Sequence, residues 1–210
     1  MENTPAAATI NIERETNGAE SLVIIFGALV LFSVLPITPV QILWVNMITT
    51  VTLALALAFE PSEENIMQRQ PRSPDEPIVS RYLLWRILFV SILIAAEVIV
   101  LFNHRLSAWE DIEAARTVAV NILVAGEMFY LFNTRFLESS SLSAKSFRGN
   151  SKAFLAVAVL ILFQIGFTYL ETANRLLGTK PLPAAEWGWI LGAGLVVFLL
   201  VELEKSSSNV

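Results

Sequence analysis

The chain has 210 residues, of which 55% are hydrophobic, and its mean hydropathy is +0.62. The sequence contains no cysteine and one histidine, which excludes disulfides, thiolate metal sites, cysteine nucleophiles and histidine metal centres. The net charge is −5 and no basic block is present, so nucleic acid is not an expected partner. Because the apolar residues gather in runs of about 15 to 20, the composition indicates membrane helices.

Six apolar segments predict an all-α membrane protein with a six-helix transmembrane bundle. The segments cover residues 17–35, 41–59, 82–103, 116–133, 153–171 and 187–203. Roughly 20 helical residues cross the hydrocarbon layer, so most segments are long enough or nearly so. We expect one transmembrane domain over 17–205 and a tail over 206–210. Residues 1–16 lack a basic and an apolar signal region, and we expect them to form a polar tail with little order.

Polar residues in the first two segments form two clusters. Asn17 and Glu20 are three positions apart and share one helix face. Asn46, Thr49 and Thr50 share a face of the second helix in the same way. Carboxylate, amide and hydroxyl oxygens are the ligands of hard cations, and polar groups at membrane depth are costly, so the pattern favours an ion-binding site. The alternative is that the Asn and Thr side chains only join helices by hydrogen bonds.

The fourth segment is short and contains Asn121 and Glu127, which favours a position inside the bundle. A carboxylate at the depth of Glu127 must pair, bind an ion or be protonated. The role of Glu97 in the third segment stays open between these possibilities. Asn121 and Gln164 are typical of hydrogen bonds between helices. Arg86 lies near a helix end, from which its charged group can reach the interface.

The distribution of positive charge predicts the orientation. If both termini lie on one side, that side holds ten of the 14 Lys and Arg residues and the other side holds four. Because cytoplasmic loops are enriched in Lys and Arg, we expect both termini in the cytoplasm and a location in the plasma (inner) membrane. The external loops are then 36–40, 104–115 and 172–186. The proline-rich stretch 61–78 is expected to form an extended cytoplasmic strap.

No catalytic motif is apparent. The sequence has no G-x-x-x-x-G-K-[ST], G-x-S-x-G or H-E-x-x-H pattern, and no soluble part large enough for a nucleotide site. Whether the chain belongs to an enzyme is therefore left open by its motifs.

Three runs carry a resemblance to a known family. They are PVQILWVNMIT at 39–49, ALAFEP at 56–61 and IMQRQPRSPDEPIVSRYLLWR at 66–86. Together they resemble the carboxy-terminal membrane region of P-type cation-transporting ATPases, most closely the calcium-pump-like type II subgroup. The likeness covers about residues 16–205. It implies helices five to ten of a ten-helix transport domain, with the lipid bilayer, the other helices and the cytoplasmic domains of a pump as partners.

The resemblance also implies a ligand set. The family's N-x-x-E matches Asn17 and Glu20, its N-x-x-T matches Asn46 and Thr49, and its later glutamate matches Glu127. These positions hold the ion in calcium pumps.

One position departs from the family pattern, because the aspartate that follows the threonine is Thr50 here. Thr50 would be a neutral ligand or a packing residue, and one carboxylate fewer should weaken Ca²⁺ binding. Ca²⁺ at a single site, a monovalent cation and proton counter-transport stay open.

The family's D-K-T-G-T phosphorylation motif is absent, as are its nucleotide-binding and actuator parts. We therefore expect the ion-binding membrane portion of an ATP-driven pump, either from a split or truncated gene or as a piece of a longer coding sequence. ATP and Mg²⁺ are implied only for the complete pump. The alternative is a free-standing, non-catalytic membrane subunit or scaffold.

Overall fold

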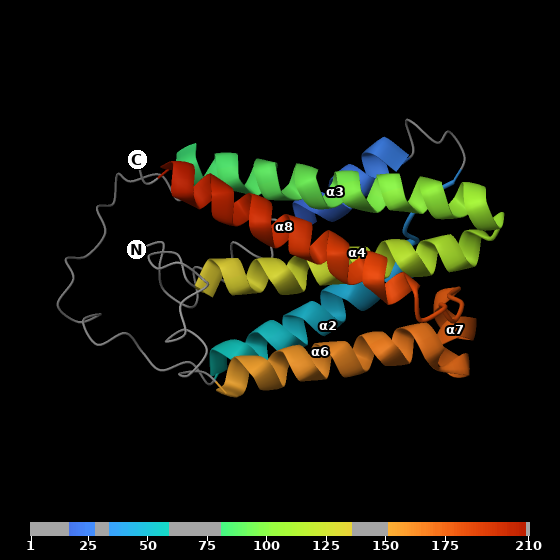
Figure 1. Ribbon diagram of the computed structural model, residues 1–210. Helices are drawn as coiled ribbons and strands as arrows, with labels where there is room; N and C mark the ends of the chain where they lie inside the picture. Colours follow the sequence, from blue (N-terminus) through green and yellow to red (C-terminus); the bar gives the residue numbers. More distant parts are fainter. Residues whose placement is uncertain (1–16, 28–33, 59–80, 136–150, 209–210) are drawn as a thin grey trace.

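The computed structural model describes residues 17–27, 34–58, 81–135 and 151–208, and the regular secondary structure in this part of the chain is all helical. Its helices are 17–27, α2 (Pro39–Ala58), α3 (Arg81–Trp109), α4 (Ile112–Arg135), α6 (Ser151–Tyr169), α7 (Glu171–Leu177) and α8 (Glu186–Ser208) (Figure 1). The tail 1–16, residues 28–33 and the proline-rich strap lie outside the described residues.

Three of the described helices are long and apolar enough to cross a membrane: Leu84–Trp109, Ile112–Asn133 and Glu186–Ser206. A fourth candidate is the pair Leu155–Tyr169 and Glu171–Leu177, which is bent by 77° at Leu170. The protein is therefore an all-helical integral membrane protein, and the expected six spans remain a prediction.

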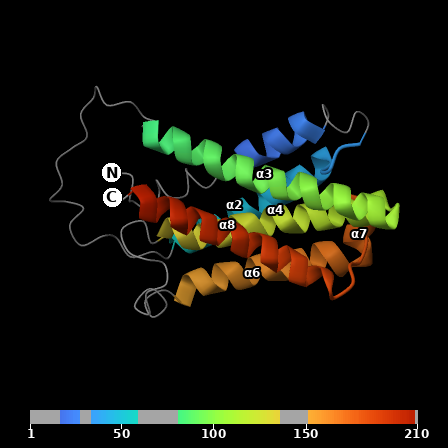
Figure 2. The ribbon, with the colours of Figure 1, turned by 45° about the horizontal axis from the view of Figure 1, so that its top comes forward.

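Helix α4 occupies the centre of the bundle. It contacts α2, α3, α6 and α8, and α3 and α8 also contact each other (Figures 1 and 2). The apolar window of α4 is 72% buried within the protein, against 33% for those of α3 and α8. The interior position expected for the fourth segment is thus confirmed, since a helix with polar interruptions is tolerated where protein covers it.

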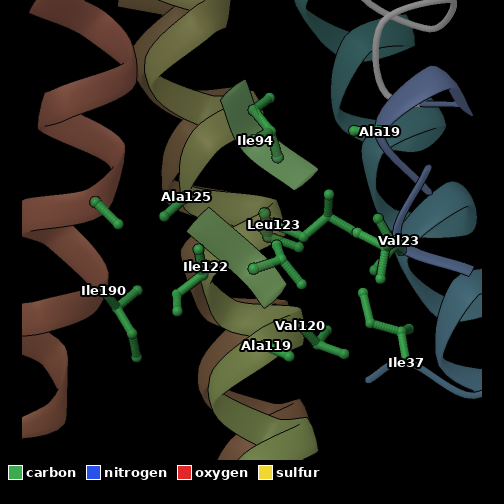
Figure 3. Packing of buried hydrophobic residues seen from close by; sticks show 14 of the residues in the cluster. Ala19, Val23, Ile37, Ile94, Ala119, Val120, Ile122, Leu123, Ala125 and Ile190 are labelled. Atoms are coloured by element: carbon green, nitrogen blue, oxygen red, sulfur yellow. The ribbon is translucent and has the colours of Figure 1, made fainter. Parts of the chain in front are cut away.

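The core joins α4 to the surrounding helices. Ile122 and Leu123 of α4 lie between Ile190 of α8 and Val23 of helix 17–27 (Figure 3). On the other side of the bundle, the Trp44 ring of α2 stacks on Phe167 of α6, with 5.8 Å between the ring centroids. The polar positions of the first two helices are held in place by this apolar packing.

The start of α2 is determined by local chemistry. Thr38 N donates to Gln41 Oε1 at 2.9 Å, and Gln41 N donates to Thr38 Oγ1 at 3.4 Å. This reciprocal pair is a capping box, and Pro39 occupies the first helical position, where no donor is needed. Gln41 Nε2 also donates to the carbonyl of Leu177 at 3.0 Å, which ties the start of α2 to the end of α7.

Helices α3 and α4 extend further than the apolar segments. The expected external loop 104–115 is reduced to Glu110 and Asp111, because polar residues at a membrane interface can continue a helix that hydropathy alone would end. Asp111 Oδ1 accepts hydrogen bonds from the backbone N of Glu113 at 3.1 Å and of Ala114 at 3.2 Å. This side chain therefore caps α4.

The helix of the expected segment 153–171 ends two residues early, at Tyr169 of α6. After the 77° bend, α7 occupies part of the expected loop 172–186. Helix α7 ends at Gly178, whose φ is 62° and which therefore adopts the left-handed conformation that glycine tolerates best. Thr179 N then donates to the carbonyl of Asn174 at 3.1 Å and closes the helix end.

Candidate cation site

The structure brings Glu20 and Asn46 together. Asn46 Nδ2 of α2 donates to Glu20 Oε2 of helix 17–27 at 3.1 Å. Glu20 is 4% exposed, and its second oxygen, Oε1, is buried and has no hydrogen-bond partner among the described residues. The pair thus presents one oriented carboxylate oxygen and one oxygen that is open to a ligand.

Packing of helix 17–27 explains why this acid is buried. Ala19 and Val23 are fully buried and face the core, and Glu20 lies beside this apolar stripe. Gly18 allows a close approach to α3, because a Cβ at this position would lie 2.3 Å from Ser91 Oγ. Small residues at such contacts let membrane helices pack closely.

Thr49 lies almost one helical turn after Asn46 and is also buried. Its Oγ1 donates to the carbonyl of Val45 at 2.9 Å. Because the hydroxyl proton is used by the main chain, the oxygen lone pairs can accept from a donor or bind a cation.

The structure does not bring the side chains of Asn17 and Thr50 to the pair of Glu20 and Asn46. Both are exposed in the described part of the chain, and neither exchanges a hydrogen bond with Glu20 or Asn46 there. The Asn17 carbonyl accepts from Ser21 Oγ at 2.7 Å.

Glu127 is 4% exposed on α4, so the carboxylate expected at membrane depth is buried. The described residues contain no group of three or more His, Asp or Glu side chains placed to hold a metal ion. A cation next to Glu20 would therefore depend largely on neutral oxygens from the amide, hydroxyl and backbone groups nearby.

A buried polar network that sequence reasoning missed joins α3, α4 and α8. Arg86 is 3% exposed and its Nε donates to Tyr130 Oη at 3.2 Å, so it does not extend to the interface as expected. Asn133 Nδ2 donates to Glu202 Oε2 at 3.1 Å, and Lys205 Nζ donates to the Asn133 carbonyl. The only signal in the sequence is that the charged residues lie within helices, because their pairing depends on three separate segments.

A second charged cluster lies at one end of the membrane spans, and its members Asp111 and Lys180 are outside them. Lys180 Nζ lies 2.7 Å from Asp111 Oδ2 and 3.5 Å from Glu113 Oε2. The hydrogen bond from Lys180 lowers the pKa of Asp111, and the same bond raises the pKa of Lys180. Since Lys180 precedes α8 and Asp111 precedes α4, the cluster joins two loops at one end of the bundle.

The sequence profile of the family described as "Cation transporting ATPase, C-terminus" matches residues 34–207. The "Probable cation-transporting ATPase F" of Mycobacterium tuberculosis is 39% identical over 186 residues, which are 89% of this chain and 20% of that protein. "Cation-transporting ATPase pma1" of Synechocystis is 36% identical over 182 residues, 81% of this chain and 19% of that protein. The "Calcium-transporting ATPase" of Bacillus subtilis is 32% identical over 189 residues, 88% of this chain and 21% of that protein. The chain spans about a fifth of the length of these curated relatives.

Proposed function

Because the chain belongs to the cation-transporting ATPases, whose carboxy-terminal membrane region it matches, we propose that it supplies the ion-binding helices of an ATP-driven cation pump. The observation that carries this proposal is the hydrogen bond from Asn46 to the buried Glu20, with Thr49 almost one turn further along α2. The bilayer and a transported cation are the partners of this region. The ATP and Mg²⁺ chemistry belongs to the remaining pump domains.

The carboxylate of Glu20 supplies the negative charge of the site. A buried ionised carboxylate is costly unless a positive charge or hydrogen bonds compensate it. Asn46 satisfies Oε2, so a cation at Oε1 would complete the environment of the group. Asn46 fixes the orientation of the carboxylate, and the Thr49 hydroxyl offers a neutral oxygen on the same face of α2.

The other expected ligands have roles in this proposal that differ from those of Glu20 and Asn46. Glu127 on α4 offers a second buried carboxylate, whereas Asn17 and Thr50 are exposed in this chain and would need covering helices to reach an ion. With threonine at position 50, the site carries less negative charge than one with aspartate there, which favours a monovalent cation or a single divalent one.

The proposed orientation places both termini in the cytoplasm of a cell whose plasma membrane holds the pump. In support, the turn between α3 and α4, helix α7 and the start of α8 lie at the same end of the bundle (Figure 1). The four basic residues assigned to the external side belong to this end: Arg105, Arg116, Arg175 and Lys180.

The test is the variant Glu20→Gln in a pump that contains this chain. The substitution keeps the size of the side chain and removes its charge, so we expect cation-dependent phosphorylation and transport to be lost. Asn46→Leu removes the orienting hydrogen bond and the amide oxygen but leaves the carboxylate in place, and we expect cation affinity to fall about 10–100-fold. Unchanged cation dependence in Glu20→Gln would contradict the proposal.

Two threonines of α2 provide a matched control. Thr49 and Thr52 are both buried, and each donates its hydroxyl proton to the carbonyl four residues earlier at 2.9 Å. We expect Thr49→Val to weaken cation affinity and Thr52→Val to leave it unchanged. Equal effects of the two variants would indicate helix packing and not ion binding.

A further inference from the structure

A cavity of about 410 Å³ lies between α4, α6 and α8, apart from the candidate cation site. Its walls are almost entirely apolar and include Val124 and Met128 of α4, Leu160 and Ile161 of α6 and Ile190 of α8. The volume lies within the range of about 300–1,000 Å³ that is typical of small-molecule sites. A helix is about 10–12 Å wide with its side chains and would not fit in this space.

One polar side chain in this wall makes no side-chain hydrogen bond to the described residues. Gln164 of α6 is 5% exposed, and neither its Oε1 nor its Nε2 makes a hydrogen bond within the described residues. The expectation that Gln164 joins two helices is therefore wrong for the described part of the chain. A buried primary amide without partners is unfavourable, so this group is suited to a ligand that can satisfy it.

The donors of the neighbouring polar side chains already make hydrogen bonds within the chain. Asn121 also lines the cavity, but its Nδ2 donates to the Thr117 carbonyl at 2.8 Å and to Thr168 Oγ1 at 3.1 Å. The Thr168 hydroxyl in turn donates its one proton to the main-chain carbonyl of Gln164 at 2.9 Å. The amide nitrogen of Asn121 thus serves the contact between α4 and α6, which leaves Gln164 as the side chain whose donor and acceptor are both open to a ligand.

Two aromatic residues indicate how deep the Gln164 amide lies in the membrane. Tyr169 and Trp187 line the same cavity, and their polar atoms make hydrogen bonds to other residues of this chain. Trp187 Nε1 donates to Tyr169 Oη at 2.8 Å, and Tyr169 Oη donates to the Leu182 carbonyl at 2.9 Å. Such aromatic pairs are typical of the membrane interface. Gln164 precedes Tyr169 by five residues and lies about 7.5 Å deeper along the helix axis.

We propose that this cavity binds a single-chain amphiphile with an amide or hydroxyl group, whose polar group pairs with Gln164. Such a group both donates and accepts, so it satisfies Oε1 and Nε2 together. An ester can accept from Nε2 but cannot donate to Oε1, and a hydrocarbon satisfies neither atom. The apolar chain of the ligand would fill the space between α4, α6 and α8.

The experiment uses the full chain in phosphatidylcholine nanodiscs and the probe 2-bromostearamide, whose bromine atom lies beside the amide and quenches indole fluorescence at short range. We expect saturable quenching that disappears in Trp187→Phe. Trp189 lies on the same helix but does not line this cavity, so Trp189→Phe should retain the quenching. Oleamide should displace the probe about tenfold better than methyl oleate, since the ester loses one hydrogen bond. Gln164→Leu should remove this preference.

Equal displacement by oleamide and methyl oleate, or the same preference in Gln164→Leu, would mean ordinary lipid contact and would overturn the proposal. A second measurement needs no variant. Oleamide should raise the thermal unfolding midpoint of the unmodified chain above that with methyl oleate, and equal midpoints would also overturn it. The cation variants at Glu20 should leave probe binding unchanged, so this proposal can fail independently of the proposed function.

Discussion

Arg105 Nε lies 2.8 Å from Glu186 Oε2, and this ion pair joins the end of α3 to the first residue of α8. The two side chains are only 11% and 8% exposed. The guanidinium carbon of Arg105 lies 5.3 Å from the ring centroid of Trp109 and 5.5 Å from that of Trp189. A planar guanidinium can pair with a carboxylate and stack on aromatic rings at the same time, which explains the choice of arginine here.

The first prediction concerns this pair. Glu186→Gln should lower the free energy of unfolding by about 3 kcal/mol, because it leaves the Arg105 charge buried without its partner. The measurement is reversible unfolding of the chain in mixed detergent micelles.

Two variants serve as controls for this prediction. The double variant Arg105→Met with Glu186→Met should recover most of the loss. Glu171→Gln removes the pair with Arg175, which is about 80% exposed, and should cost less than about 0.5 kcal/mol. A Glu186→Gln variant as stable as the unmodified chain would contradict a role of the ion pair in joining α3 to α8.

The second prediction concerns the selectivity of the cation site. Thr50→Asp adds a carboxylate four residues after Asn46, on the same helix face. Because affinity for divalent cations rises with the number of charged ligands, the ratio of divalent to monovalent affinity should increase at least about tenfold. Cation-dependent phosphorylation of a pump that contains the chain measures this ratio. Met47→Asp is the control, because Met47 is exposed like Thr50 but directly follows Asn46 and does not share its helix face. The same increase in both variants would mean a general effect of charge.

The third prediction concerns the short turn between α3 and α4. Glu110 has a φ of 53°, which is in the left-handed region and costs an L-residue about 1–2 kcal/mol. Glu110→Gly should therefore raise the unfolding free energy by about 1 kcal/mol. Ala108→Gly, two residues earlier in the exposed last turn of α3, should lower it by about 1 kcal/mol. If both glycines destabilise the chain, the backbone at position 110 does not carry this strain.

The fourth prediction concerns pH and the pair of Asp111 with Lys180. The pKa of Asp111 is lowered from 3.8, so its contribution to stability is complete above pH 3.8 and is lost as the pH falls through the folded value. The pKa of Lys180 is raised from 10.5, so its contribution is complete below pH 10.5 and is lost as the pH rises through the folded value.

The pair should therefore stabilise the chain fully between pH 3.8 and pH 10.5 and progressively less below and above this range. The measurement compares thermal unfolding midpoints of the unmodified chain and of Asp111→Asn across this pH range. Asparagine keeps the cap of α4 and removes only the charge. A difference between the two midpoints that persists unchanged well below pH 3.8 would mean that it does not arise from the ion pair.

The sequence alone was sufficient for the local features of this protein. Apolar segments indicated the helices, and the spacing of Asn46 and Thr49 placed two candidate oxygen ligands on one face of α2. The capping box at Thr38 and Gln41 was not predicted, although it is equally local, because its hydrogen bonds join residues three positions apart. Helical periodicity and caps depend on neighbours in the chain, so they can be predicted without a fold.

Only the tertiary structure decided which groups meet across helices. It joined Asn46 to Glu20 by a hydrogen bond, buried Arg86 beside Tyr130 and placed Gln164 in an apolar cavity, where its amide has no partner among the described residues. Each of these outcomes depends on the rotation and separation of helices that are distant in sequence. In a membrane both lipid and protein accept apolar side chains, so hydropathy marks a span but cannot say which of its faces another helix covers.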